Sequence, residues 1–258
     1  MIKDYFKLIK FKYHLSFILV ILGAFFFGEG FGINYFSFKN ILLTYISFNL
    51  LMYTGLYTLN DIFDKEDDSK HPGKKNRPIA SGRIKVKKAL IIAIILIVIG
   101  LLISIFIKKY LILLYLLFII INLFYSKIGK KIKYIEIITN SITHPLRFFM
   151  GAFIFNLIIP YPTLITIFII AIGLSTDRRI IEKKDKGEKS RRVLKKYSQK
   201  ELGIILNMGF IILLLIFWIN YPNYKNFYIT TTIFYIMVVL LFLEYKELET
   251  IFKKIWLK

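Results

Sequence analysis

Long apolar runs separated by short charged segments dominate this sequence. Most of these runs approach the ~20 residues with which a helix crosses the hydrocarbon core of a bilayer. Hydrophobic residues make up 57% of the 258 residues, whereas a soluble domain has an apolar share nearer ~45–50%. The pattern predicts an all-α integral membrane protein, a polytopic transmembrane helical bundle formed by the whole chain. We expect its spans at residues 15–36, 41–59, 89–107, 110–125, 135–155, 163–175, 202–219 and 227–243.

The basic residues indicate the orientation of the chain. If the N-terminus is cytoplasmic, 32 of the 37 lysines and arginines fall in inner segments, as the positive-inside rule requires. We expect a protein of the cell membrane whose two termini and charged loops, 60–88 and 177–200, face the cytoplasm. The net charge of +21 indicates anionic lipid heads and phosphorylated substrates as partners. Nucleic acid is not expected, because the basic residues stand in short loops and not on a separate domain.

The two ends of the chain differ from the spans between them. Residues 1–13 mix lysines with aromatic residues, which predicts an interfacial amphipathic start. Residues 245–258 alternate apolar and charged positions, which is typical of an amphipathic tail that lies on the membrane surface. The chain has no cysteine, so disulfides and thiolate metal sites are excluded.

An acidic segment interrupts the apolar runs at residues 59–84. On a helix, Asp61, Asp64 and Asp68 would fall within about 60° of one another. Three carboxylates repel one another unless a cation lies between them, and Mg²⁺ binds one or two carboxylates together with phosphate oxygens. The segment therefore predicts a Mg²⁺ and phosphate site, with the later basic residues holding the phosphates. The alternative is a solvated loop whose charges only keep it in water.

The order of these residues resembles the first signature of the UbiA-type intramembrane prenyltransferase superfamily. The chain reads Asn60-Asp61-x-x-Asp64-x-x-x-Asp68 and then Arg77-Pro78-Ile79-Ala80-Ser81-Gly82. In that superfamily the aspartates bind Mg²⁺ and a diphosphate, so the resemblance implies a UbiA-like ring of about eight to nine spans with cytoplasmic cap loops. It also implies four catalytic residues, Asp61, Asp64, Asp68 and Arg77. The three aspartates of this set are the expected metal ligands.

Two further stretches are similar to one branch of the superfamily, the decaprenyl-phosphate phosphoribosyltransferases (5-phosphoribose synthases). The first is the insertion His71-Pro72-x-Lys74. The second is Arg178-Arg179-x-x-Glu182, followed by Arg192 and Tyr197, where other members carry a second pair of aspartates about four residues apart. Here Asp177 and Asp185 are eight apart, which argues against a second Mg²⁺. Positive-inside topology alone is the alternative explanation for the cations of this loop.

Arg147 is the basic residue that stands inside a predicted span. Arginine there costs at least ~2.5 kcal/mol on insertion, and such residues usually face a bundle interior or a polar cavity. With Leu146 and Gly151 it resembles the Leu-Arg-x-x-x-Gly stretch of the superfamily. The alternative is snorkelling toward the charged loop 127–133.

The branch resemblance implies a Mg²⁺-dependent transfer of 5-phosphoribose from phosphoribosyl diphosphate to a polyprenyl phosphate, with release of diphosphate. It implies a substrate-binding set: Asn60, Lys74, Ser81, Lys130, Arg147, Arg178, Arg179, Glu182, Arg192 and Tyr197. One alternative is a prenyltransferase that moves a prenyl group from a prenyl diphosphate lipid to an aromatic or glycerophosphate acceptor. Another is a non-catalytic lipid-binding or transport protein, although the acidic and basic residues of segment 59–84 do nothing for folding in a bilayer.

Overall fold

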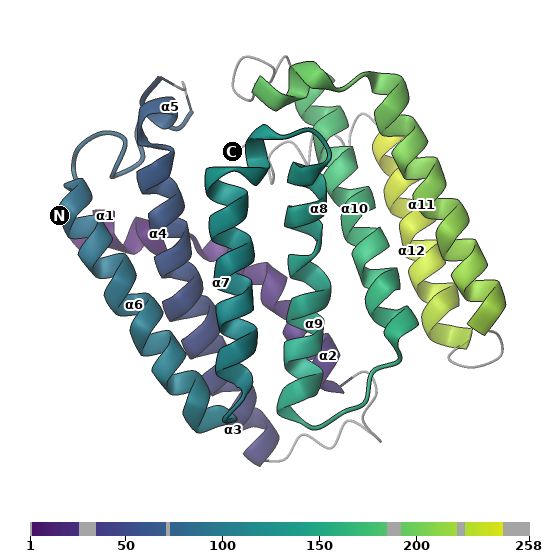
Figure 1. The fold of residues 1–258 in the computed structure, drawn as a ribbon, viewed down its shortest axis with the longest axis horizontal. Coiled ribbons are helices and arrows are strands. Elements are labelled where there is room, and N and C mark those ends of the chain that lie inside the picture. Colours follow the sequence, from purple (N-terminus) through teal and green to yellow (C-terminus); the bar gives the residue numbers. More distant parts are fainter. Residues whose placement is uncertain (1, 26–34, 71–72, 185–191, 221–224, 245–258) are drawn as a thin grey trace. The chain divides into compact units, whose positions relative to one another are not determined.

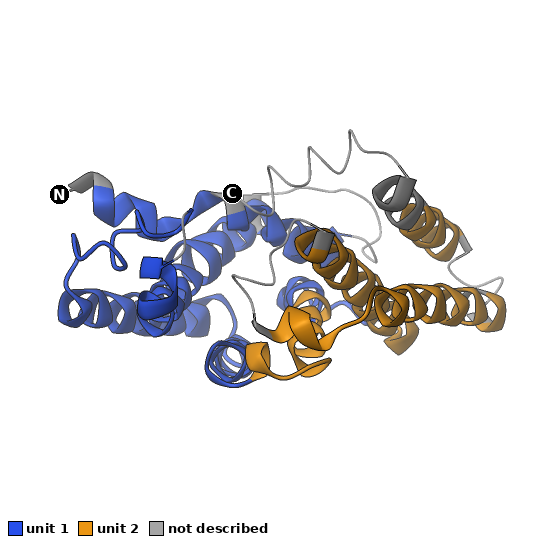
Figure 2. Cartoon of the chain, turned by 90° about the horizontal axis from the view of Figure 1, so that it is seen from above, with its two compact units in different colours: residues 1–128, 146–159 blue, residues 129–145, 160–258 orange. Residues whose placement is uncertain are grey.

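The computed structural model describes residues 2–25, 35–70, 73–184, 192–220 and 225–244. The regular secondary structure of these residues is entirely helical, and no strand occurs in them (Figure 1). The expected all-α class is confirmed. The chain divides into two compact units (Figure 2), unit 1 with Met1–Ile128 and Leu146–Ile159, and unit 2 with the two remaining segments.

Unit 1 holds the N-terminal helices and most of α9. Its elements are α1 (Ile2–Ile9), η1 (Phe11–Phe17), α2 (Ile18–Phe25), α3 (Tyr35–Thr44), η2 (Tyr45–Tyr53), α4 (Thr54–Phe63), α5 (Lys65–Lys70), α6 (Val86–Ile107), α7 (Leu111–Lys127) and α9 (Thr143–Ile154). The α3, η2 and α4 helices follow one another without a break, and α6 packs along η2 and α4. Buried aromatic and aliphatic side chains from η2, α4, α7 and α9 form the core.

The middle of the second span, η2, is a π-helix. Its hydrogen bonds join residues five apart, so residues at that spacing share a face more nearly than they would on an α-helix. Phe48 and Tyr53 stand in this relation, and their rings stack with centroids 6.1 Å apart. Both are buried, so the π-helix presents a paired aromatic surface to the interior of unit 1.

α9 crosses α2 at very short range inside unit 1. A Cβ atom added to Gly23 would lie 1.8 Å from the carbonyl oxygen of Phe148, and one added to Gly151 would lie 1.9 Å from that of Val20. Only residues without a side chain permit this approach, as at other close helix crossings in membranes. Gly151 thus fixes the position of the helix that carries Arg147.

Unit 2 is built mainly from the last three helices. Its elements are η3 (Gly129–Lys131), α8 (Ile135–Ser141), the first turn of α9, α10 (Tyr161–Lys184), η5 (Arg192–Lys196), α11 (Gln199–Asn220) and α12 (Lys225–Glu244). α10 packs against α8, α11 and α12. The ring of Tyr235 on α12 fits against Gly173 of α10 and Gly209 of α11.

The helices follow most of the expected spans, with three differences. α10 continues to Lys184, so the start of the expected loop 177–200 is wrong and its first charges stand on a helix. The fifth span is interrupted at Ile142, between α8 and α9. The second span begins at Tyr35, earlier than expected. The expected surface tail 245–258 lies outside the described residues.

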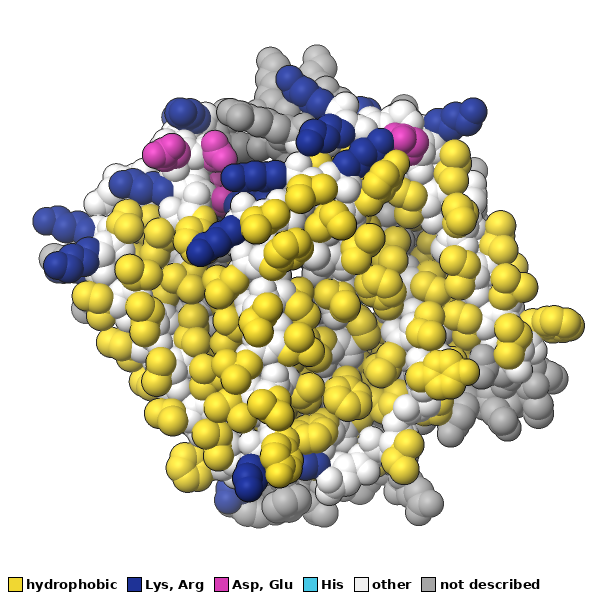
Figure 3. Space-filling view, viewed as in Figure 1, with side chains coloured by type: hydrophobic (Ala, Val, Ile, Leu, Met, Phe, Trp, Pro, Cys, Tyr) yellow, Lys and Arg dark blue, Asp and Glu magenta, His cyan; other side chains and the backbone are white. Residues whose placement is uncertain are grey.

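Exposed hydrophobic side chains mark the lipid-facing helices. In the described part of the chain, four helical stretches are long and apolar enough to cross a membrane: Ser37–Phe63, Val86–Ile107, Leu111–Lys131 and Gln199–Ile216. On α6, Ile91 and Ile94 are half exposed, and Phe106 is almost fully exposed. Figure 3 shows hydrophobic side chains covering α6 and α7. Soluble proteins rarely expose so large an apolar surface to water, so these helices face lipid.

Candidate functional site

Unit 1 gathers two of the three predicted aspartates around one arginine. Nη1 of Arg77 donates hydrogen bonds to Oδ1 of Asp61 at 3.0 Å and to Oδ2 of Asp68 at 2.6 Å. Asp61 lies on α4 and Asp68 on α5, and both are almost fully buried. Burial raises the pKa of the Asp68 carboxyl, and the neighbouring Arg77 opposes part of that rise. Lys74 adds a longer ion pair to Asp68, at 3.7 Å.

The expected continuous helix through the three aspartates is wrong. α4 ends at Phe63, and Asp64 takes a non-helical backbone conformation (φ −93°, ψ 2°) before α5 begins. The three carboxylates therefore do not share one helical face. Asp61 and Asp68 still meet, because the chain bends at Asp64 and Arg77 returns to both.

The Arg77–Gly82 stretch forms a compact turn that aims the Arg77 side chain. Ile79 is fully buried, in a cluster with Leu8 and Ile84. Ser81 donates its hydroxyl to the Arg77 carbonyl at 2.7 Å, which places this hydroxyl in the turn itself. Gly82 has φ +78°, a backbone conformation that glycine adopts without strain.

A residue outside the predicted site completes this group of charges. Lys10, at the junction of α1 and η1, donates from Nζ to Oδ1 of Asp61 at 2.6 Å and lies 5.0 Å from the centre of the Tyr57 ring. Burial lowers the pKa of Lys10, and Asp61 opposes the shift. We call the set Lys10, Asp61, Asp68, Lys74 and Arg77 the Asp61 cluster.

The N-terminal helix is attached to the acidic segment instead of only lying on the membrane. Asp4 on α1 accepts a hydrogen bond from Nε of Arg83 at 3.0 Å, and this contact lowers the pKa of Asp4. Leu8 on the same helix packs into the apolar cluster under the Arg77 turn. The amphipathic pattern of residues 1–13 thus serves to bring α1, and Lys10 at its end, to the Asp61 cluster.

The donor atoms of the Asp61 cluster fit a hard divalent cation. The carboxylates of Asp61 and Asp68 converge on the Nη1 atom of Arg77. Asn60 precedes Asp61 in the chain, and its Oδ1 atom is buried with no hydrogen-bond partner among the described residues. Carboxylate and amide oxygens are the ligands that Mg²⁺ takes. In the part of the chain that the structure describes, no three acidic or histidine side chains form a ready metal-binding group. Asp61, Asp68 and Asn60 could therefore hold part of the coordination shell, with other oxygens coming from a substrate.

Arg147 is buried inside unit 1 and does not snorkel. Its guanidinium carbon lies 4.6 Å from the ring centre of Phe118, 5.0 Å from that of Tyr53 and 5.9 Å from that of Phe48. Such rings attract a cation through their negative faces. The π-helix therefore supplies two walls of an aromatic cage for a charge that would otherwise be expensive within a span.

Unit 2 brings the second predicted group together around Arg179. This arginine donates from Nε and Nη2 to the two carboxylate oxygens of Glu136, at 2.7 and 2.6 Å, and from Nη1 to Glu182 at 2.8 Å. Arg178 donates to the other oxygen of Glu182 at 3.1 Å. We call these four residues the Arg179 cluster. Glu136 was missed by the sequence analysis, although a lone acid in a predicted span already signals a buried partner.

The remaining predicted residues of unit 2 take separate positions. The hydroxyl of Tyr197 accepts the backbone N–H of Tyr134 at 2.7 Å and is buried, so it braces η5 against α8. Lys130 lies on η3. Arg192 begins η5, and its side chain lies outside the description. Asp177 on α10 is buried, and neither of its carboxylate oxygens has a hydrogen-bond partner among the described residues.

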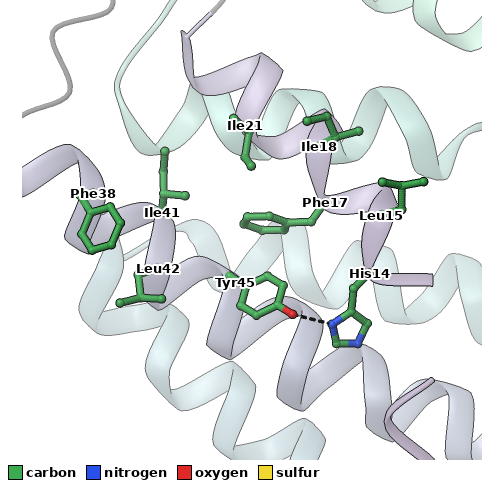
Figure 4. Close-up of a pocket in the computed structure, with 9 residues that line it drawn as sticks. All are labelled: His14, Leu15, Phe17, Ile18, Ile21, Phe38, Ile41, Leu42 and Tyr45. Atoms are coloured by element: carbon green, nitrogen blue, oxygen red, sulfur yellow. Dashed lines mark hydrogen bonds between the residues drawn. The ribbon is translucent and has the colours of Figure 1, made fainter. Parts of the chain in front are cut away.

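An open groove of about 380 Å³ lies between η1–α2 and α3–η2 of unit 1 (Figure 4). Its walls are apolar except for His14 and Tyr45, which are joined by a 2.8 Å hydrogen bond. The other ring nitrogen of His14 donates to the carbonyl of Ile9 at 3.2 Å. This pair therefore connects the wall of the groove to the turn that carries Lys10.

Comparison with known proteins assigns the family. The sequence profile of the UbiA prenyltransferase family matches residues 16–255. The chain belongs to the UbiA prenyltransferase family.

Two relatives of this chain are named digeranylgeranylglyceryl phosphate synthase. The protein of Sulfurisphaera tokodaii is 34% identical over 101 residues, which cover 39% of this chain and 36% of the relative. The protein of Saccharolobus solfataricus is 34% identical over 121 residues, which cover 47% of this chain and 42% of the relative. The matches thus span about two fifths of these relatives' length. Their name favours the prenyltransferase alternative over the phosphoribosyltransferase branch.

Solved structures agree on the fold. A UbiA homologue from Archaeoglobus fulgidus, bound to GPP and Mg²⁺, has a TM-score of 0.75 at 18% identity, covering 92% of this chain and 86% of its own. A structure of a digeranylgeranylglyceryl phosphate synthase in membranes has a TM-score of 0.68 at 21% identity, covering 98% and 94%. The fold of this chain is therefore the UbiA fold.

Proposed function

We propose that this protein is a Mg²⁺-dependent prenyltransferase that moves a prenyl group from a prenyl diphosphate to the hydroxyl of a glycerophosphate lipid. The observation that carries the proposal is the Asp61 cluster, in which two buried carboxylates converge on Arg77 at the end of a membrane helix. The name of the two relatives supports the glycerophosphate acceptor, and the A. fulgidus homologue that binds GPP and Mg²⁺ supports the donor.

The cluster suits the diphosphate end of such a donor. Asp61, Asp68 and Asn60 would hold Mg²⁺, which when bound supplies positive charge to a leaving diphosphate. Arg77 carries several N–H donors in a fixed plane and binds phosphate oxygens well. Lys74, which is 41% exposed, can reach a phosphate from the water side. These residues bind, orient and neutralise the diphosphate, which is the main contribution that such a site makes to rate.

The reaction breaks the bond between C1 of the prenyl group and the diphosphate oxygen, and the electron pair leaves with the diphosphate. A new C–O bond forms between C1 and the acceptor hydroxyl oxygen. The hydroxyl proton is lost to water or to the released diphosphate. The aromatic rings of Phe48, Tyr53 and Phe118 surround Arg147, and we propose that this buried cation also faces the anionic end of a substrate.

The Arg179 cluster gives little support to phosphoribosyl transfer. That interpretation needed Arg178 and Arg179 as extra phosphate ligands, but three nitrogens of Arg179 are already bonded to Glu136 and Glu182. A phosphate could displace these bonds only by removing Arg179 from the buried Glu136 and Glu182, which is strongly unfavourable. The prenyl diphosphate donor, with fewer anionic groups, needs no such rearrangement.

The deciding experiment offers both donors to the purified protein. Protein in detergent with Mg²⁺ is incubated with labelled geranylgeranyl diphosphate and geranylgeranylglyceryl phosphate, and separately with labelled phosphoribosyl diphosphate and a polyprenyl phosphate. We expect a doubly prenylated glycerophosphate in the first reaction and no labelled lipid in the second. The reverse result would reject the proposal in favour of phosphoribosyl transfer. An Asp61→Asn variant is the control that assigns the activity to this site.

A further inference from the structure

We propose that Lys10 is a diphosphate-binding residue, placed beside Asp61 by a strained turn at the end of α1. The inference rests on the proposed function, because it takes the diphosphate of a prenyl donor as the ligand. Its starting point is a contact that the sequence pattern did not predict, the 2.6 Å hydrogen bond from Nζ of Lys10 to Oδ1 of Asp61.

The surroundings of Lys10 distinguish it from a lysine that meets lipid headgroups. Its side chain is only 13% exposed and lies over the ring of Tyr57. Lys7, one turn earlier on α1, is 53% exposed, and its ion pair within the described part of the chain is a long one, to Asp4 at 3.8 Å. The two lysines look alike in the sequence. The structure directs one to the surface and the other into the Asp61 cluster.

The backbone at Lys10 is strained. Its φ and ψ are both 52°, in the left-handed region that residues with a Cβ atom rarely adopt. Such conformations persist where the surrounding structure holds them, and they gather at functional sites. Here the following turn is closed by a hydrogen bond from the Tyr13 N–H to the Lys10 carbonyl at 2.9 Å, and the Tyr13 ring stacks on Tyr57 at 4.7 Å.

A second set of contacts fixes the turn from its other side. His14 donates to the carbonyl of Ile9, the residue before Lys10, and accepts a hydrogen bond from the Tyr45 hydroxyl. Tyr45 begins the π-helix η2, so the turn is anchored to the centre of unit 1. Figure 4 shows the His14–Tyr45 contact at the edge of the groove. These contacts hold a strained residue in place, and the side chain they position is the one that reaches Asp61.

The charges explain what this lysine would do. An ammonium group has three N–H donors, and Asp61 accepts one of them. When Asp61 turns its oxygens to a divalent cation, the ammonium competes with that cation for the same carboxylate. A diphosphate on the cation gives Lys10 new acceptors next to the old one. Lys10 should therefore oppose binding of the metal alone and favour binding of the metal together with diphosphate.

The test compares Lys10→Met with Lys7→Met in the purified full-length chain. Calorimetry measures the affinity for Mn²⁺ alone, and then for inorganic diphosphate at saturating Mg²⁺. For Lys10→Met we expect about three- to tenfold tighter Mn²⁺ binding, and about ten- to a hundredfold weaker diphosphate binding for the loss of one charge-assisted hydrogen bond. Lys7→Met should change neither, and Lys10→Arg should restore most of the diphosphate affinity.

Opposite shifts in the two affinities support the inference, because a lysine that only stabilised the fold would weaken both. Weakening of both, or unchanged diphosphate binding, would overturn it. Lys10→Gly accepts the left-handed backbone and repeats the measurement if Lys10→Met does not fold. If Lys10 variants lose diphosphate affinity but the wild-type protein transfers no prenyl group, the proposed function fails and the assignment of Lys10 as a diphosphate ligand stands.

Discussion

The two units each contain an arginine that bridges two carboxylates, and they use it differently. In unit 1, Arg77 contacts Asp61 and Asp68 through the single atom Nη1, and its side chain is 27% exposed. In unit 2, Arg179 uses three nitrogens on Glu136 and Glu182, and its side chain is 2% exposed. The first bridge leaves most of its donors for a ligand. The second has its donors occupied inside the protein.

This difference separates a binding group from a structural one. The Asp61 cluster also holds Lys10 and Lys74, so it contains three cations and two carboxylates. This excess of positive charge favours the binding of an anionic ligand. In the Arg179 cluster the charges balance, two arginines with two glutamates. Motifs that look equally functional in the sequence therefore have different roles, and the following variants test that division.

The largest expected effect is on folding, in the Arg179 cluster. Arg179→Met leaves Glu136 and Glu182 without their main buried partner, which costs about 3–5 kcal/mol. Thermal unfolding in detergent should show a large loss of stability, and the additional change Glu136→Gln should recover part of it. Unchanged stability with a weaker substrate affinity would instead make Arg179 a ligand-binding residue.

Asp61→Asn should act mainly on activity. The amide keeps an oxygen that accepts from Lys10 and Arg77 but removes the charge that would hold Mg²⁺. We expect a loss of about 10²–10³-fold in kcat/KM for prenyl transfer, with a smaller loss of thermal stability than for Arg179→Met because both hydrogen bonds to this oxygen can be kept. Initial rates over a Mg²⁺ titration check this. Wild-type Mg²⁺ dependence in the variant would remove Asp61 from the metal site.

Gly151→Ala tests how unit 1 positions Arg147. The added methyl would lie 1.9 Å from the Val20 carbonyl oxygen, so α2 and α9 must separate, at about 1–3 kcal/mol. The matched control is Gly203→Ala in unit 2, where a Cβ meets no atom within 4 Å and helix propensity favours alanine. Unfolding curves should show a loss for the first variant only. Equal behaviour of the two would contradict the close crossing.

The smallest effect is expected for Arg178→Ala. This side chain is 34% exposed and makes an i,i+4 pair with Glu182, a kind of contact that contributes about 0.3–0.5 kcal/mol. The equilibrium constant of unfolding and the KM for prenyl diphosphate should each change by less than about threefold. A large rise in the KM for phosphoribosyl diphosphate, if the protein used that donor, would restore the phosphate-binding role first inferred for Arg178.

The fold was largely predictable from the sequence, and the site only in part. Apolar runs specify membrane helices because the bilayer satisfies no backbone hydrogen bonds, and the Asn60–Gly82 pattern located the acidic group. The break at Asp64 was not predictable, since the residues on both sides of it favour a helix. Lys10 was equally hidden, because four similar lysines stand in residues 1–13 and periodicity does not say which one meets a carboxylate.

The sequence by itself determined the class of protein, its family resemblance and which short segments carry its charges, because hydrophobicity and residue order are local properties. Only the tertiary structure decided which charges are paired with one another. Arg77 stands nine residues after Asp68, and Arg179 stands three residues before Glu182, but the number of their donors that remain available depends on distant residues. Lys10 is 51 positions from Asp61 and Glu136 is 43 from Arg179, and folding alone brings each pair into contact.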